Sequence, residues 1–211
     1  MRRRTQDMRL RFINAAGTLF IARGFAAVTM EAVAAEARAS KVTLYGYFRN
    51  KESLFEAFVN EAGKGGIEEL EAARYEQDTE QALRHLGLAY LELVTRPEVI
   101  NLNRLIMGEA GRQPQLSQIF YQNGPRRTLI AISETIETLM QADKLRRSDL
   151  RETSLYFKSL CEAGLLERQL WGLDGTPDAQ TRAVAVEKAI SLFLVLFGEA
   201  EQKVISPVCN R

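Results

Sequence analysis

The sequence predicts an all-α protein of some nine to ten helices, in which a three-helix N-terminal domain is joined to a larger helical body. Apolar residues recur at spacings of three and four along most of the chain, and no stretch alternates with period two for long. Prolines stand where helices would begin and glycines where helices would end. The 211 residues, 46% of them hydrophobic, are enough to bury a substantial core.

Four helices are expected near the N-terminus, over residues 5–23, 30–37, 41–47 and from residue 51 onward. Gly24 would end the first helix, and Thr29, Ser40 and Asn50 would cap the other three, since these side chains accept hydrogen bonds from free helix N–H groups. The second and third helices are only about three residues apart, a spacing typical of a helix-turn-helix motif. In that motif the second helix enters the major groove of DNA, with its first residues near base edges.

The third helix carries side chains suited to DNA. Lys41 and Thr43 offer hydrogen-bond donors at its exposed start, and Val42 fits the methyl group of a thymine. Tyr45 and Tyr47 carry hydroxyl groups on rigid rings, which suit phosphate oxygens. The alternative is that these tyrosines are half-buried packing residues and that the lysines are merely solvated. The candidate DNA-binding residues are Thr29, Arg38, Ser40, Lys41, Val42, Thr43, Tyr45, Gly46, Tyr47 and Lys51.

Lys51 belongs to this set because it stands in the first turn of the fourth helix. Free backbone N–H groups there attract an anion, and a lysine adds to that attraction. Leu44 and Phe48, one turn apart, are expected to anchor the third helix on the first two. The segment therefore separates into anchoring side chains and DNA-facing side chains.

The order of these residues resembles the N-terminal signature of the TetR family of transcriptional regulators. The matching segments are Ala15-Ala16, Leu19-Phe20, Gly24-Phe25, Thr29, Val33-Ala34, Ala37-Arg38-Ala39-Ser40, Thr43-Leu44-Tyr45-Gly46-Tyr47-Phe48 and Lys51-Glu52-Ser53-Leu54. The resemblance implies a homodimer whose helix-turn-helix heads bind a palindromic double-stranded DNA operator. It also implies a helical body that senses a small-molecule effector, so that the effector releases a repressor from its operator; activation in place of repression is left open.

Two positions depart from the signature. Arg38 replaces the glycine of the turn, which costs roughly 1 kcal/mol if the backbone there is left-handed, unless a phosphate contact offsets it. Gly46 stands inside the Thr-Leu-Tyr-x-Tyr-Phe segment and has no side chain to reach a base. Base recognition is therefore expected to depend on residues 40–43.

Three glycines, Gly63, Gly65 and Gly66, interrupt the helix that would continue past the head. Glycine inside a helix costs roughly 1 kcal/mol relative to alanine, so a bend or break is expected. The glycines are either a functional hinge or a plain boundary between domains. We accordingly divide the chain into a DNA-binding domain, residues 1–60, and a ligand-binding and dimerisation domain, residues 61–211.

Six further helices are expected in the body, over residues 80–95, 97–111, 114–123, 125–142, 149–172 and 177–203. The last two carry more apolar surface than one buried stripe requires, so we expect them to pair with a second copy in a four-helix bundle. The alternative is a purely intramolecular core. Residues 103–127 resemble the AefR-like branch of the family, whose members often control efflux or stress genes.

An effector pocket is expected among the middle helices of the body. Aromatic side chains with polar tips suit an apolar pocket, although each also suits an ordinary core, and Arg104 suits a polar ligand group or a surface ion pair. The candidate ligand-binding residues are Tyr90, Arg104, Phe120, Tyr121, Tyr156, Phe157 and Trp171.

Charge and composition exclude several other classes. Residues 1–60 carry a net charge of +5 and residues 61–211 one of −4, as expected when only one end meets a polyanion. A non-specific architectural DNA-binding protein, the main alternative, would be basic over most of its surface. The single histidine, His85, and the two cysteines, Cys161 and Cys209, make no metal-binding or catalytic motif, so we expect no enzyme, metal or cofactor. No apolar run is long enough for a membrane span, which favours a cytoplasmic location.

Overall fold

The computed structural model describes residues 2–199, which form twelve α-helices and one short 3-10 helix. The prediction of an all-α fold is confirmed. The elements are α1 (Arg2–Arg23), α2 (Met30–Glu36), α3 (Lys41–Tyr45), α4 (Lys51–Gly63), α5 (Gly66–Ala72), η1 (Ala73–Tyr75), α6 (Thr79–Val94), α7 (Pro97–Glu109), α8 (Pro114–Asn123), α9 (Pro125–Gln141), α10 (Leu150–Glu162), α11 (Leu165–Leu170) and α12 (Ala179–Phe197). No helix in this part of the chain has the length and apolar character needed to cross a bilayer.

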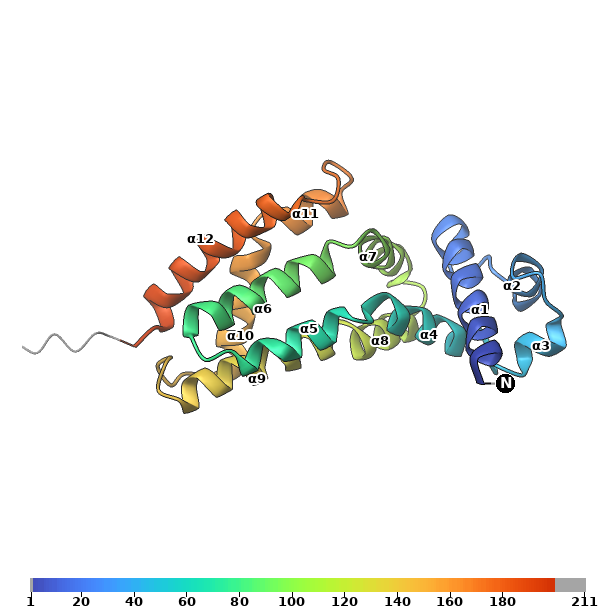
Figure 1. The fold of residues 1–211 in the computed structure, drawn as a ribbon. Helices are drawn as coiled ribbons and strands as arrows, with labels where there is room; N and C mark the ends of the chain where they lie inside the picture. The colour runs from blue at the N-terminus through green and yellow to red at the C-terminus, as the bar shows by residue number, and fades with distance from the viewer. Residues whose placement is uncertain (1, 200–211) are drawn as a thin grey trace, which may run out of the picture.

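The N-terminal helices form a head at one end of an elongated molecule, and α4 leads from it into the body (Figure 1). The head core contains a cluster of aromatic rings, in which Phe20, Phe25 and Phe55 lie with their centroids 5.2–5.8 Å apart. α1 and α4 approach closely at Gly17, where a Cβ atom would overlap the ring of Phe58. This packing fixes α4 to the head.

The predicted helix caps are confirmed. The Thr29 hydroxyl accepts a hydrogen bond from the Ala32 N–H at 3.2 Å. The Ser40 hydroxyl accepts one from the Thr43 N–H at 3.0 Å, and the Asn50 carboxamide one from the Ser53 N–H at 2.9 Å. Each cap satisfies a free N–H group at a helix start, so the three helices begin where the sequence predicts.

Three predicted helices have different ends in the structure. α3 ends at Tyr45 instead of Tyr47, because Gly46 forms its C-cap. The single helix expected over residues 149–172 is two helices, since Gly164 adopts a left-handed φ of 81° between α10 and α11. The last helix ends at Phe197. The part of the predicted helix beyond residue 199 lies outside the described residues.

The predicted break at the glycines is present. Lys64 is extended and Gly65 has a φ of 75°, so the helix is interrupted after Gly63 and α5 begins at Gly66. Gly66 lies so close to α6 that a Cβ would stand 2.6 Å from Leu93 Cδ1. The glycines therefore permit a turn and a tight contact, while their role as a hinge stays a prediction.

Two core clusters hold the molecule together. The head cluster contains the buried residues of α1–α4 together with Leu102, Ile106 and Leu116 of α7 and α8. The body cluster contains buried residues of α5, α6, α9, α10 and α12, and α10 packs against both α9 and α12. The head thus rests directly on α7 and α8. The domain boundary expected at residue 60 falls inside α4.

Candidate nucleic-acid interface and ligand cavity

α3 presents one face to the interior and one to solvent. Leu44 and Phe48 are only 0% and 4% exposed and anchor the helix in the head cluster, as the sequence predicts. On the opposite side, Val42 is 84% and Tyr45 45% exposed. An apolar side chain exposed to this extent at the start of a short helix is available for contact with a base.

The polar groups at the start of α3 are already ordered by one another. The hydroxyls of Ser40 and Thr43 lie 2.8 Å apart, and Ser40 also caps the helix. Lys41 forms an ion pair with Glu31 of α2, and its ammonium lies 5.7 Å from the Tyr45 ring centroid. The hydrogen bond to Lys41 lowers the pKa of Glu31. Because both side chains are more than half exposed, the pair is weak and Lys41 can exchange it for a phosphate.

Three further candidates on this side have mixed roles. The exposed Thr29 uses its hydroxyl as the α2 cap, and Gly46 is the C-cap of α3. Tyr47 is half-buried, with its ring 5.7 Å from that of Phe12. Its ring therefore packs in the head, as the alternative reading expected, and only its hydroxyl end is left as a candidate phosphate contact.

Arg38 occupies the turn between α2 and α3 with a φ of 50°. The position thus keeps the left-handed backbone that a glycine would favour. This is the condition under which the sequence analysis expects arginine to cost roughly 1 kcal/mol relative to glycine. Its N–H donates to the Ala35 carbonyl at 3.0 Å, and its side chain is exposed. The guanidinium is free to follow the DNA backbone.

The structure corrects the role expected of Lys51. Its ammonium donates to the carbonyl oxygens of Phe25 and Val28 at 2.7 and 2.8 Å and lies 4.3 Å from the centroid of the Phe25 ring. Burial lowers the pKa of this lysine. Lys51 therefore joins α4 to the loop between α1 and α2, and it is removed from the candidate DNA-binding set.

Two arginines of α1 contribute to the interface in a way that the sequence analysis missed. The Arg11 guanidinium donates to the Ala37 carbonyl at 2.6 Å, at the end of α2, and the Arg9 guanidinium lies 5.4 Å from the Phe48 ring centroid. Both side chains support the helix-turn-helix from behind. The sequence signal was a pair of basic residues on the helix next to the motif.

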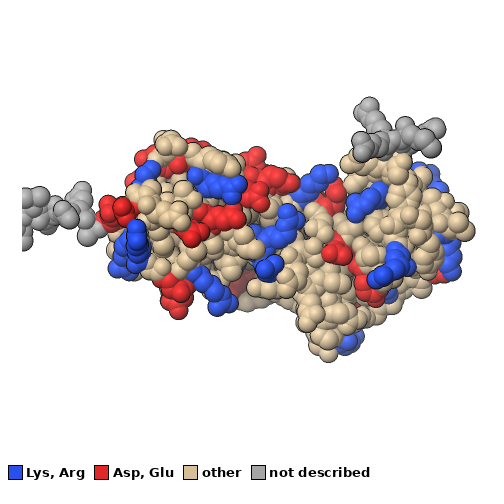
Figure 2. Space-filling model, turned by 90° about the horizontal axis from the view of Figure 1, so that it is seen from below, with Lys and Arg blue, Asp and Glu red and all other residues tan. Residues whose placement is uncertain are grey.

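Charge is unevenly distributed between the two parts. On the face drawn in Figure 2, acidic residues gather mainly on the body, while basic residues occur on both body and head. This agrees with the charge difference between the two parts of the sequence. A polyanion is therefore attracted to the head more than to the body.

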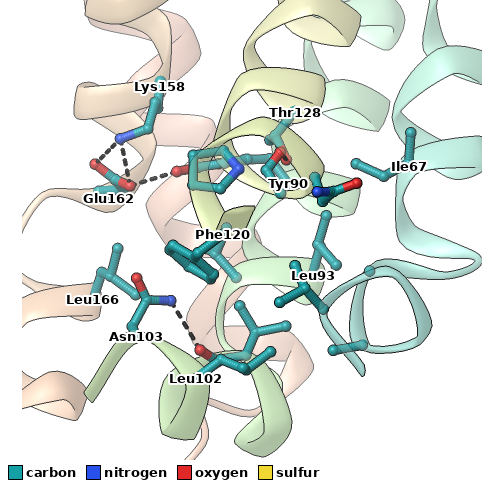
Figure 3. A pocket seen from close by; sticks show the side chains of 18 residues that line it. Ile67, Tyr90, Leu93, Leu102, Asn103, Phe120, Thr128, Lys158, Glu162 and Leu166 are labelled. Atoms are coloured by element: carbon teal, nitrogen blue, oxygen red, sulfur yellow. Dashed lines mark hydrogen bonds and ion pairs between the residues drawn. The ribbon is translucent and has the colours of Figure 1, made fainter. Parts of the chain in front are cut away.

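A cavity of about 190 Å³ lies between the head and body clusters. Its walls come from α4 to α11, and most of the lining side chains are apolar (Figure 3). Val59 and Ala62 of α4 and Gly63 at the glycine break line it on the side of the head. Leu93 of α6 and Leu166 of α11 line the other sides.

One wall of the cavity carries a cluster of three polar side chains, Tyr90, Lys158 and Glu162, hereafter the polar triad. The Tyr90 hydroxyl donates to Glu162 Oε1, and Lys158 Nζ donates to both carboxylate oxygens at 2.8 and 2.9 Å (Figure 3). Burial, followed by the Glu162 charge, raises the pKa of Tyr90 well above its ordinary value. Tyr90 is therefore a neutral donor at physiological pH.

Of the candidate ligand-binding residues, only Tyr90 and Phe120 line this cavity. Phe157 is 0% exposed and packs against Phe193 in the body cluster. The Arg104 guanidinium donates to the Gln169 and Leu170 carbonyls, which joins α7 to α11. The remaining three candidates are exposed aromatic residues away from the cavity, namely Tyr121, Tyr156 and Trp171. These five assignments do not hold for this cavity.

The sequence analysis missed Lys158 and Glu162. A Lys and a Glu four residues apart on a helix usually form a solvated ion pair. The spacing of apolar residues along the helix did not set these two side chains apart from other surface residues. Their place in the cavity depends on α6 packing against α10, which brings Tyr90 to the pair. Helical spacing alone therefore could not have found the polar triad.

The outer side of α12 exposes a row of apolar side chains. Leu192 is 56%, Val195 84% and Leu196 48% exposed, and they are neighbours on one face of the helix. The opposite face packs Ile190, Phe193 and Phe197 into the body cluster. α12 thus carries apolar surface on both sides, as the sequence predicts.

Family models match both parts of the chain. The model described as bacterial regulatory proteins, tetR family, matches residues 12–58, and the model described as AefR-like transcriptional repressor, C-terminal domain, matches residues 81–199. The uncharacterized HTH-type transcriptional regulator YvkB of Bacillus subtilis (strain 168) is 31% identical over 96 residues, which cover 44% of this chain and 49% of that protein. The chain thus aligns with about half the length of this curated relative.

Solved structures resemble the fold over nearly the whole chain. The Flavonoid-responsive Regulator FrrA is 28% identical, with a TM-score of 0.75, and the match covers 92% of this chain and 98% of that one. A TetR transcriptional regulator from Agrobacterium tumefaciens is 25% identical, with a TM-score of 0.70, over 90% of this chain and 94% of that one. The likeness includes the arrangement of the head on the body.

Proposed function

Because the chain belongs to the TetR family of transcriptional regulators, a family of DNA-binding repressors, we propose that it is a homodimeric repressor which a small molecule releases from a palindromic operator. The observation that carries this proposal is the exposed face of α3. Val42 and Tyr45 face solvent there, while Leu44 on the other face is buried and holds the helix in place. The remaining contacts are assigned to Arg38, Lys41 and Tyr47, and to Ser40, Thr43, Thr29 and Gly46 around them.

Dimerisation follows from the surface of α12. A single helix-turn-helix contacts half of a two-fold operator, so two heads are needed, about 34–36 Å apart in successive major grooves. The exposed Leu192, Val195 and Leu196 offer an apolar face that a second copy would bury. This supports pairing through α12, with α10 beside it.

The cavity provides the place for an effector. It is bounded by α4, which is fixed to the head, and by the glycine break that connects α4 to α5. A ligand that prefers a different position of α4 would change the distance between the two heads of a dimer. A differential affinity of about 1–3 kcal/mol is enough for a regulatory response. FrrA, a flavonoid-responsive regulator of similar fold, supports a small organic effector. A regulator of this kind acts where the DNA is, so we propose a cytoplasmic location.

The DNA-binding proposal is tested by selecting genomic fragments on the purified full chain and sequencing them. We expect a palindromic site bound at least about 10³-fold more tightly than a scrambled sequence at the same salt concentration. Equal affinity for both sequences would instead identify an architectural DNA-binding protein.

Two tyrosines of similar exposure provide a matched pair of variants. Tyr45→Ala on α3 is expected to weaken operator binding at least about tenfold, since it removes a contact at the groove. Tyr121→Ala on α8 is expected to leave it unchanged, although Tyr121 is 48% exposed and Tyr45 45%. If the two variants bound alike, α3 would not be the DNA-reading helix.

A second matched pair separates dimerisation from DNA binding. Val195 and Val42 are both 84% exposed, on α12 and α3. Val195→Glu should yield a monomer in analytical ultracentrifugation, whereas Val42→Glu should remain a dimer that has lost the operator. A wild-type monomer at micromolar concentration would rule out the dimer-based mechanism.

A further inference from the structure

The polar triad leaves one ammonium proton and one carboxylate lone pair unused, and the Tyr90 oxygen can also accept a hydrogen bond. Lys158 Nζ has three protons, two of which are directed at the oxygens of Glu162. Glu162 Oε1 accepts from Tyr90 and Lys158, whereas Oε2 accepts only from Lys158 within the described chain. Lys158 and Glu162 both line the cavity, so a ligand there can reach the remaining ammonium proton and the remaining carboxylate lone pair.

The charges of the triad favour an uncharged ligand. Lys158 and Glu162 neutralise each other, and Tyr90 stays protonated because burial raises its pKa. A carboxylate in the cavity would lie against Glu162, and an ammonium against Lys158, and neither would find a free counter-ion. Burying a charge without a partner is costly. A hydroxyl group fits, because it donates to Glu162 Oε2 and accepts from Lys158 Nζ at once.

The size of the cavity limits the rest of the ligand. An engineered apolar cavity of roughly 150 Å³ takes up benzene. At about 190 Å³, this cavity has room for one ring with a short substituent, whereas a three-ring compound would extend beyond it. Leu93, Phe120 and Leu166 present apolar surface to such a ring.

We propose that the cavity binds a neutral one-ring phenol, or an alcohol of similar size, with its hydroxyl at Lys158 and Glu162 and its apolar part against Leu93, Phe120 and Leu166. The role of this ligand as an effector rests on the proposed function, whereas its binding does not. The specificity is set by the neutral, two-way hydrogen-bonding character of the triad.

The test measures ligand binding by calorimetry on the full chain without DNA. The probe is 4-propylphenol, of about ten non-hydrogen atoms, a size that suits the cavity. Its matched analogues are propylbenzene, 4-propylbenzoate, 4-propylbenzylamine and a three-ring flavonoid. We expect the phenol to bind at least about tenfold more tightly than each of the others. A site built for a hydroxyl rejects the three analogues that lack one, and the flavonoid exceeds the size of the cavity.

Glu162→Gln tests the assigned chemistry, since it leaves the Lys158 charge without its partner. We expect this variant to bind 4-propylphenol more weakly and to gain affinity for 4-propylbenzoate, at least about tenfold over wild type. A variant that had only lost its fold would gain affinity for nothing. Glu137→Gln, at an exposed site on α9, is the control and should behave as wild type. Leu166→Phe, which fills the cavity, should abolish binding of the phenol.

Several results would overturn the inference: equal binding of propylbenzene and the phenol, tighter binding of a charged analogue or the flavonoid by wild type, or no binding of the phenol at all. Operator release is measured separately by fluorescence anisotropy. If the phenol binds and the operator stays bound, the effector part of the proposed function fails and the inference stands. If only a charged or three-ring compound binds and releases the operator, the inference fails and the proposed function stands.

Discussion

Arg38 offers the sharpest test of the physical reasoning, because Arg38→Gly should make the protein more stable. The residue has a φ of 50° at the end of α2. A left-handed conformation costs a side-chain-bearing residue roughly 1–2 kcal/mol, and glycine avoids most of this cost. Glycine also gives the unfolded chain more freedom, which takes back about 0.4–1 kcal/mol. The expected net gain is roughly 0.5–1 kcal/mol.

The assay is chemical and thermal unfolding followed by two signals. Circular dichroism follows all the helices, whereas the fluorescence of Trp171, the single tryptophan, follows the body. A gain of this size corresponds to a rise in Tm of roughly 1–4 °C for a chain of this length. If the head unfolds separately, the rise should appear in circular dichroism and be absent from the fluorescence.

Arg38→Ala is the matched control. It removes the same guanidinium but keeps a Cβ at the left-handed position, so it should show no stabilisation. Both variants should lose the proposed phosphate contact equally. Because a dimer makes this contact twice, the slope of log affinity against log salt should fall by about 1.8. The strain argument would be wrong if the alanine variant were as stable as the glycine variant. The DNA role of Arg38 would be wrong if neither slope changed.

Three other predictions follow from close contacts and buried groups. Lys51→Met should reduce the free energy of unfolding by about 1–3 kcal/mol, because the carbonyl groups of Phe25 and Val28 lose a charged donor. It should leave the salt dependence of operator binding unchanged. A weaker salt dependence would restore the phosphate-binding role of Lys51. Gly17→Ala should cost about 1–3 kcal/mol by overlap with Phe58, whereas Gly63→Ala, whose Cβ would meet nothing within 4 Å, should be neutral or stabilising in urea titrations. The pKa of Tyr90 in the folded protein lies above its unfolded value of 10.0, so the native state holds the proton more tightly and stability falls as the pH rises past 10. Tyr90→Phe should flatten this fall in stability between about pH 9 and pH 11. An unchanged pH dependence would refute the assignment.

Much of the head could be predicted from sequence because its determinants are local. Thr29, Ser40 and Asn50 cap their helices through hydrogen bonds to residues three positions away, so their chemistry and spacing are both visible in the sequence. The glycine break before α5 has the same character, since backbone freedom belongs to the residue itself. Gly164 was missed because a lone glycine is tolerated inside a helix, and here it instead adopts a φ of 81°.

The site residues that could not be predicted depend on tertiary contacts. Lys51 has the right position for an anion, yet it donates to carbonyls more than twenty residues away in sequence. Phe157 and Phe120 are both phenylalanines on predicted helices, and only packing decides that one is buried and the other lines the cavity. Charge and periodicity thus indicate that a residue has a role, and the fold decides which role.

The place of the cavity between two cores limits how this regulator can evolve. Val59 and Phe120 belong both to the cavity wall and to the packing of the head. A substitution there that adapts the protein to a new compound also changes how firmly the DNA-reading helices are held. Thr128 and Leu166, on α9 and α11, line the same cavity away from the head cluster. Under the proposed function, new ligand specificities are therefore expected to arise from substitutions on the α9 and α11 wall. Such substitutions can change which compound binds without changing the affinity for DNA.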